Sequence, residues 1–381
     1  GNFRTDEEAI VGTGIGGRTS YKKYGRILIG HLRQLVFFLS SPGDAYTQRR
    51  NEGFKTMSIM RLFEFNSCKH SARQIALDLL NNGLKNDRPE WVVDATRSLM
   101  GATPYAHSNL KDFEQYAALF REYKSYLDWE QKANLYFDEK CVHYVHKKGY
   151  RPEVAEQLKA HIEELRPMAF KIPSIMFSLC YSLIAFDCHF LAGHYQQAID
   201  VLEKAIEYFQ SRRYDSSHHQ HVLFYRKVLC FKELGQYEKG HQAIQECLRL
   251  STEGTVNWYA TLEIHFYLCM HTERYSEALE VYKAATCHKR FVGLNEATQE
   301  VWNIFGAYIF LAYKLTCRDL PDPHSRAAKF LNQVPIFSRD KNGLNVAILI
   351  AHAVLQLIEG KQDNIWERVW ALVKYRERYL K

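Results

Sequence analysis

The sequence has few of the residues that make tight turns and lacks the cysteine spacings of common metal sites. Its 381 residues include only 9 prolines and 20 glycines, which argues against many short strands joined by turns. None of the nine cysteines forms a Cys-x-x-Cys pair, and most of them lie inside apolar stretches. We therefore expect the cysteines to be small buried side chains of a protein in a reducing compartment.

Long apolar runs and a strong excess of one charge are also missing. No stretch of about 18 apolar residues occurs, so no transmembrane helix is predicted. The first thirty residues lack the apolar run and cleavage site of a signal peptide, and a cytoplasmic location is expected. The 50 basic and 43 acidic residues leave a net charge of +7. The basic residues stand in short pairs such as Arg212-Arg213, which indicates a solvated surface and makes nucleic acid an unlikely partner.

What the sequence does contain is a helical pattern that hardly stops after residue 25. Apolar residues, 46% of the chain, recur at three- and four-residue spacings. This pattern predicts helices over 25–39, 52–66, 71–84, 90–101, 108–147, 153–166, 174–192, 195–211, 217–234, 237–250, 256–272, 275–287, 297–316, 324–333, 344–359 and 362–379. Pro89 and Pro152 suit the first turn of a helix. Glycines expected where one helix ends and the next begins are Gly83, Gly193, Gly235 and Gly360.

A short motif recurs three times in the middle of the chain. It consists of a tight turn, an aromatic residue and, three positions later, a small residue. The three copies carry Tyr195 and Ala198, Tyr237 and Gly240, and Tyr275 and Ala278. The turn would reverse the chain between two antiparallel helices, and the small residue would let them approach closely.

This motif resembles the turn and second helix of the tetratricopeptide repeat, most strongly over 174–287. The tyrosines are 42 and 38 residues apart, against a family period of about 34. Longer helices, as in long-period bacterial members, would account for the difference. The tryptophan of the family's first helix is missing. The resemblance implies an all-α fold, an α-α superhelix built as a solenoid of antiparallel helix pairs. We divide the chain into a flexible Gly-rich leader (1–22), divergent helix pairs (23–168), the repeats (169–290) and C-terminal helical repeats or a cap (291–381).

The resemblance also implies a groove lined by the first helix of each pair. Mapped onto this chain, the partner-binding positions are Asp187, Tyr225, Lys232, Glu263, Tyr267 and Met270, with His271 beside them. Tyrosine mixed with charge is typical of surfaces that hold a peptide. The alternative is that these residues make ordinary contacts between helices or with solvent.

Two other motifs could carry chemistry. The segment 12–19 satisfies G-x-G-x-x-G, but no strand precedes it and no parallel strands follow, so a flexible leader is the better interpretation. Cys141, His143 and His146, and separately the group His218, His219 and His221, lack a full set of zinc ligands at metal-binding spacing. We expect no cofactor, no metal and no catalytic residue.

Three functions remain. The favoured one is a non-catalytic scaffold or adaptor that holds a protein or peptide in the groove. The alternative is a regulatory sensor whose superhelix changes curvature when a signalling peptide binds. An RNA-binding helical repeat ranks last, because it requires basic residues at repeated groove positions and only Lys232 fits.

Overall fold

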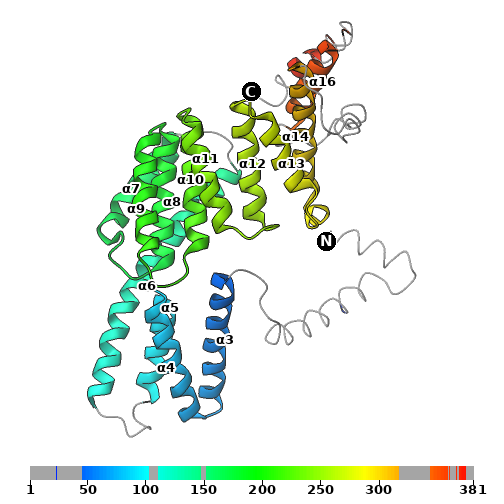
Figure 1. The fold of residues 1–381 in the computed structure, drawn as a ribbon. Coiled ribbons are helices and arrows are strands. Elements are labelled where there is room, and N and C mark those ends of the chain that lie inside the picture. Colours follow the sequence, from blue (N-terminus) through cyan, green and yellow to red (C-terminus); the bar gives the residue numbers. More distant parts are fainter. Residues whose placement is uncertain are drawn as a thin grey trace. The chain divides into compact units, whose positions relative to one another are not determined.

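The described part of the chain is built from helices and turns, and it contains no strand (Figure 1). The computed structural model describes residues 45–102, 110–146, 152–316 and 344–358, together with positions 23, 360, 366 and 369–374. The predicted all-α fold is therefore confirmed for these residues. The Gly-rich segment 12–19 and the predicted helices over 25–39 and 324–333 lie outside them, as does most of 362–379.

Two compact units divide the chain, and each is described by itself. The first comprises residues 1–131, 171–175 and 213–215. Its helices are α3 (Ala45–Phe65), α4 (Lys69–Lys85), α5 (Pro89–Ala102) and the first part of α6 (Leu110–His146). Their core contains Met60, Leu79 and Trp91, which are at most 4% exposed. Gly53 lets α3 lie against this core, because a Cβ added there would be 2.1 Å from Trp91 Cζ2.

Gly83 corrects one expectation in this unit. It was predicted to end a helix, yet it lies inside α4 and is buried. A Cβ at this position would lie 2.8 Å from Val92 Cγ2, so the absence of a side chain allows α4 and α5 to approach each other. The turn between these two helices instead places Asp87 in the left-handed region, with a φ of 48°.

The second unit comprises residues 132–170, 176–212 and 216–381. From residue 195 onward its consecutive described helices pack against one another (Figure 1), and the unit as a whole is a series of helices. These are the second part of α6, α7 (Pro152–Leu165), η2 (Arg166–Met168), α8 (Ile175–Leu191), α9 (Tyr195–Gln210), α10 (Ser217–Glu233), α11 (Tyr237–Leu250), α12 (Val256–His271), α13 (Tyr275–Thr286), η3 (Phe291–Gly293), α14 (Glu296–Leu315) and α16 (Leu344–Ile358). Most predicted ends agree with these bounds to within two residues; the start of α3, predicted at 52, is an exception.

The recurring motif makes the predicted helix hairpins α8–α9, α10–α11 and α12–α13. Gly193 and Gly235 occupy the left-handed region in the first two turns, with φ values of 73° and 66°. The third turn uses Glu273 at a φ of 56°. Ala198 and Ala278 are fully buried. A Cβ on Gly240 would lie 2.9 Å from Leu268 Cδ1 of α12, so this small residue also allows close packing against the next pair.

Candidate functional site

Four of the predicted groove positions lie near one another in the second unit. We define the first-helix face as Tyr225 and Lys232 of α10, Glu263 and Tyr267 of α12, and Tyr308 of α14. Tyr267 is the most open of them, with 48% of its surface exposed, and the other four are partly buried. Tyr308 was not predicted from the sequence, because the repeat motif does not extend to α14.

Electrostatic effects show that these side chains are close to each other. Burial raises the pKa of the Tyr225 phenol, and the Glu263 carboxylate raises it further. Burial also raises the pKa of Tyr267, where Glu263 acts in the same direction and Lys232 in the opposite one. The pKa of Tyr308 is raised by burial and then by Tyr267. Three successive first helices therefore contribute to one surface.

Glu263 is the unusual group on the first-helix face. Burial raises the pKa of its carboxyl group, and no cation among the described residues acts to lower it. Within the described residues this carboxylate makes no ion pair or hydrogen bond, although Tyr225 and Tyr267 are near it. A partly buried, unpaired carboxylate favours a positively charged ligand group, because an opposite charge offsets part of its desolvation.

The remaining predicted positions lie elsewhere. Asp187 is only 6% exposed and is bonded to Lys140 Nζ at 2.5 Å, so it forms a buried ion pair rather than part of an open surface. Met270 packs against the core formed by α12, α13 and α14. His271 is exposed and stacks on Tyr237, with ring centroids 5.8 Å apart. We leave these three residues out of the first-helix face.

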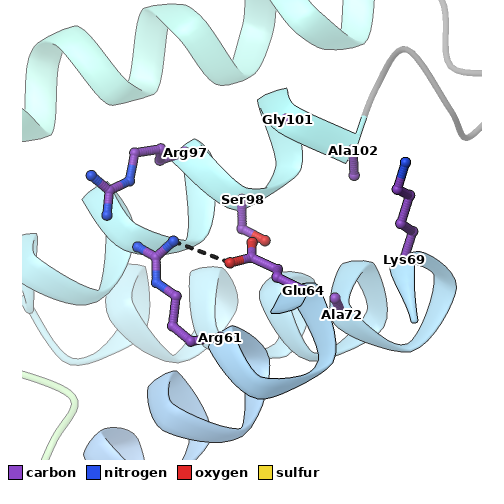
Figure 2. A pocket seen from close by; sticks show the side chains of 8 residues that line it. All are labelled: Arg61, Glu64, Lys69, Ala72, Arg97, Ser98, Gly101 and Ala102. Atoms are coloured by element: carbon purple, nitrogen blue, oxygen red, sulfur yellow. Dashed lines mark hydrogen bonds and ion pairs between the residues drawn. The ribbon is translucent and has the colours of Figure 1, made fainter. Parts of the chain in front are cut away.

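A pocket of 230 Å³ lies in the first unit between α3, α4 and α5 (Figure 2). Arg61 and Arg97 line it, but their charges are already matched. Arg61 contacts Glu64 at 3.1 Å and Asp94 at 2.9 Å, and Arg97 contacts the same Asp94 at 3.3 Å. This pairing leaves the two guanidinium groups little attraction for an anion.

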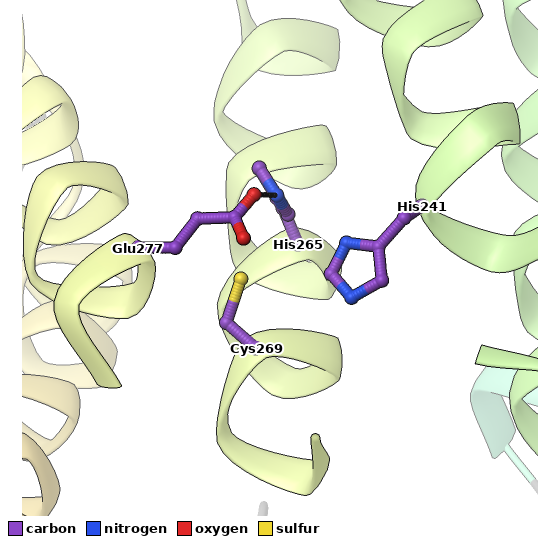
Figure 3. Close-up of side chains that lie close together, drawn as sticks. All are labelled: His241, His265, Cys269 and Glu277. Atoms are coloured by element: carbon purple, nitrogen blue, oxygen red, sulfur yellow. Dashed lines mark hydrogen bonds and ion pairs between the residues drawn. The ribbon is translucent and has the colours of Figure 1, made fainter. Parts of the chain in front are cut away.

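A second group of polar side chains is buried where α11 meets α12 and α13. We call His241, His265, Cys269 and Glu277 the histidine–cysteine cluster. One nitrogen, sulfur or oxygen atom of each residue lies within 4.8 Å of those of the others. Figure 3 shows His265 and Cys269 on one helix, with His241 and Glu277 approaching from either side. His265 Nε2 lies 3.1 Å from Glu277 Oε1.

Burial dominates the protonation of this cluster. It lowers the pKa of both His241 and His265, so each ring is neutral near pH 7 and one ring nitrogen keeps a free lone pair. It raises the pKa of the Cys269 thiol to about 12. Both ring nitrogens of His241 and Nδ1 of His265 are buried without a hydrogen-bond partner. Such groups carry an uncompensated desolvation cost.

The histidine–cysteine cluster was not predicted from the sequence. Its only local signal is the four-residue spacing of His265 and Cys269, which places two ligands on one face of a helix. The histidines that stand close together in the sequence are arranged differently. His221 Nε2 faces Thr261 Oγ1 at 3.0 Å, and His219 stacks on Phe209. The side chains of His143 and His146 lie outside the described residues.

Comparisons with known proteins give a distant match. No family model and no curated protein matches the chain. Among solved structures, the crystal structure of the apo form of RapI matches with a TM-score of 0.45 and 15% identity. The match covers 88% of this chain and 98% of that one. A likeness at this level carries no function to this chain. Among the described residues, no helix is both long and apolar enough to cross a membrane.

Proposed function

We propose that this chain is a non-catalytic binding protein whose first-helix face holds a peptide or protein segment that bears a positive charge. The observation that carries the proposal is Glu263. Its carboxylate is partly buried, and no cation in the part of the chain that the structure describes lies near enough to lower its pKa. A lysine, an arginine or a free amino terminus of a partner would supply the missing charge.

The surroundings of Glu263 support a peptide as the partner. Tyr225 and Tyr267 come from successive first helices, and each offers an apolar ring with a polar hydroxyl group. Tyrosines of this kind bury large areas at low entropic cost and often dominate binding energies. The face combines them with only one basic residue, Lys232, which pairs with the adjacent Glu233 at 2.9 Å. This composition disfavours a phosphate backbone as the ligand.

The chemistry of the face supports binding rather than catalysis. It consists of three phenols, one carboxylate and one ammonium group. Nucleophilic catalysis needs a nucleophile held beside a base, and these five side chains do not provide such a pair. Protein or peptide is therefore the proposed partner class.

A peptide selection followed by titration tests the proposal. A random peptide library would be selected on the purified chain, and the affinity of the selected peptides would be measured by calorimetry. We expect peptides with a lysine, an arginine or a free amino terminus at a constant position. Glu263→Gln should weaken their binding about 10- to 100-fold, because a hydrogen bond to a charged group is worth about 1.5–3 kcal/mol. Tyr267→Phe should have a smaller effect, since it retains the ring.

Glu280→Gln is the matched control, since Glu280 is an exposed carboxylate of the second helix α13. It should leave the affinity unchanged. Equal losses for Glu263→Gln and Glu280→Gln would contradict the proposed site. Selection of no peptide, together with salt-sensitive binding to RNA, would instead favour the nucleic-acid alternative.

A further inference from the structure

The histidine–cysteine cluster lies where one helix pair joins the next. His241 belongs to α11, the second helix of one pair. His265 and Cys269 belong to α12, and Glu277 to α13, which together form the following pair. We propose that these four side chains bind a single zinc-class divalent metal ion, which ties α11 to the α12–α13 hairpin.

The distances between the four side chains support the proposed metal site. The four potential ligand atoms lie within 4.8 Å of one another. A tetrahedral zinc ion with bonds of about 2.0–2.3 Å holds its ligand atoms roughly 3.3–3.8 Å apart. Inward shifts of about an ångström or less would therefore complete the site. His265 and Cys269 already share one face of α12 because they are four residues apart.

The buried ring nitrogens of His241 and His265 support the proposed metal site independently. His241 is 7% exposed and His265 is 5% exposed. Three of their four ring nitrogens are buried without a hydrogen-bond partner, whereas buried polar groups in folded proteins are nearly always paired. A metal ion would accept a lone pair from each ring. Coordination would thereby offset part of the desolvation cost of these two rings.

The ligand set indicates which class of ion fits. Two imidazoles, one sulfur and one carboxylate suit zinc and similar transition metals, whereas calcium and magnesium prefer oxygen ligands. Four protein ligands leave no open position, which is typical of a structural site rather than a catalytic one. The side chain of Glu277 is 40% exposed and provides a route by which the ion could enter.

Charge at the site is balanced by the same residues. A divalent ion would be neutralised by the Cys269 thiolate, which forms on coordination, and by the Glu277 carboxylate. A cation lies beside the cluster: the guanidinium of Arg274 is 3.7 Å from Glu277 Oε2. Arg274 also forms an ion pair with Glu238. It would therefore keep a carboxylate partner if Glu277 turned towards the metal.

The proposed metal site does not overlap the proposed binding surface. Glu263 and Tyr267 are four residues apart on α12, as are His265 and Cys269. The two pairs are offset by two residues, or roughly 200° around the helix axis. They therefore face opposite sides of α12. Peptide binding and zinc binding can therefore be tested separately, and failure of one would leave the other testable.

Metal titration of the tag-free chain tests the proposal. The protein would be stripped with a chelator, and zinc would then be added in competition with a chromophoric chelator. We expect one zinc per chain and a higher midpoint of thermal unfolding with zinc than without it. Cobalt in place of zinc should give the visible bands of a tetrahedral site and a thiolate-to-cobalt charge-transfer band. The cobalt spectrum uses the parent chain, so it does not depend on whether a variant folds.

Matched variants locate the ion. Cys269→Ser and His241→Gln should each weaken zinc binding by at least about 100-fold, more than the 10- to 100-fold that loss of an outer-shell partner costs. Cys247→Ser changes another fully buried cysteine of the same unit and should retain the parent affinity. His218→Gln probes the other group of histidines and should also retain it.

Three results would overturn the proposal. The first is a cobalt spectrum without a thiolate band. The second is equal zinc affinity in Cys269→Ser and Cys247→Ser. The third is loss of zinc binding in His218→Gln alone. This result would show that the ion binds adventitiously at the group His218, His219 and His221.

Discussion

Helix α12 takes part in two junctions of opposite character. Towards α13 and α14 it contributes to an aromatic core that includes Trp258, Phe266, Trp302, Phe305 and Ile309. The rings of Phe266 and Phe305 are stacked there with centroids 4.2 Å apart. Towards α10 and α11 it meets buried histidines, through Thr261 opposite His221 and His265 beside His241. We call the first the aromatic junction and the second the histidine junction.

The stability of the aromatic junction and that of the histidine junction depend on different interactions. Apolar rings are stabilised by leaving water, whatever the pH or the metal content of the solution. Buried imidazoles must remain neutral, and their ring nitrogens need partners that these helices supply only in part. The aromatic junction should therefore be stable under all ordinary conditions. The histidine junction should respond to protons and, under our proposal, to metal.

The largest expected effect is on the aromatic junction. Trp302 is fully buried, so Trp302→Ala should lower the free energy of unfolding by about 3–5 kcal/mol through lost burial and the cavity that remains. Urea denaturation at pH 7 measures this change. Trp366→Ala, at a position 68% exposed, should stay within about 0.5 kcal/mol of the parent. Similar effects for both variants would mean that Trp302 does not anchor this core.

Acid should weaken the histidine junction. Burial, and secondarily the nearby His218, lower the pKa of His221 to about 4 from a usual value of 6.5. Between these values the unfolded chain binds one proton more than the folded chain. The stability contributed by neutral His221 is thus complete above pH 6.5 and is lost as the pH falls to 4. The shift corresponds to about 3 kcal/mol.

His221→Gln removes this titration while keeping an amide that can reach Thr261. The free energy of unfolding of the parent should therefore fall by about 3 kcal/mol more than that of the variant between pH 7 and pH 4. Urea titrations at several pH values measure both slopes. Parallel slopes would show that His221 is as easily protonated in the folded chain as in the unfolded one.

A smaller effect of opposite sign is expected for His241→Leu. Leucine removes two ring nitrogens that lack partners, so the variant should be about 1 kcal/mol more stable than the parent in the presence of a chelator. With zinc the order should reverse, since only the parent keeps the fourth ligand. Thermal unfolding with and without zinc distinguishes the two states. A variant less stable than the parent in both conditions would contradict our description of this junction.

The smallest expected effect on stability is on the first-helix face, at the partly buried Glu263 of α12. Glu263→Gln should change the free energy of unfolding by no more than about 0.5 kcal/mol, because the carboxylate bonds to none of the described residues and the amide would therefore break no bond seen there. Partner binding, in contrast, should weaken strongly. Chemical denaturation and peptide titration on the same protein sample separate the two. A loss of several kcal/mol in stability would show that Glu263 is structural.

Local patterns were sufficient to predict the helices and their turns. Periodicity places α8 to α13 to within two residues, because an amphipathic helix is encoded by residues three and four positions apart. Ala198, Gly240 and Ala278 were predicted to be packing positions, and all three are buried. Gly83 was misassigned because glycine is used both at helix ends and where two helices approach closely. The sequence pattern alone does not distinguish these uses.

The two candidate sites could not be predicted in full from the sequence, because they depend on contacts between residues that are far apart in the chain. Tyr225 and Glu263 were predicted individually from the repeat resemblance, but their mutual closeness and the missing cation follow only from the packing of α10 against α12. Asp187 was also predicted as a groove position from the repeat resemblance. It is buried instead, in an ion pair with Lys140 of α6, which lies 47 residues earlier in the chain.

The sequence by itself determined that this chain is an array of helix pairs, since turns and apolar stripes are properties of short segments. The tertiary structure alone decided that His241, His265, Cys269 and Glu277 meet, because they stand on three helices and only two of them share a helix face. The opposite directions of Glu263 and of the pair His265 and Cys269 follow, in contrast, from their two-residue offset along α12. The physical reason for this contrast is that side-chain chemistry depends on which helices pack together, and that packing is set by the whole buried surface rather than by any local run of residues.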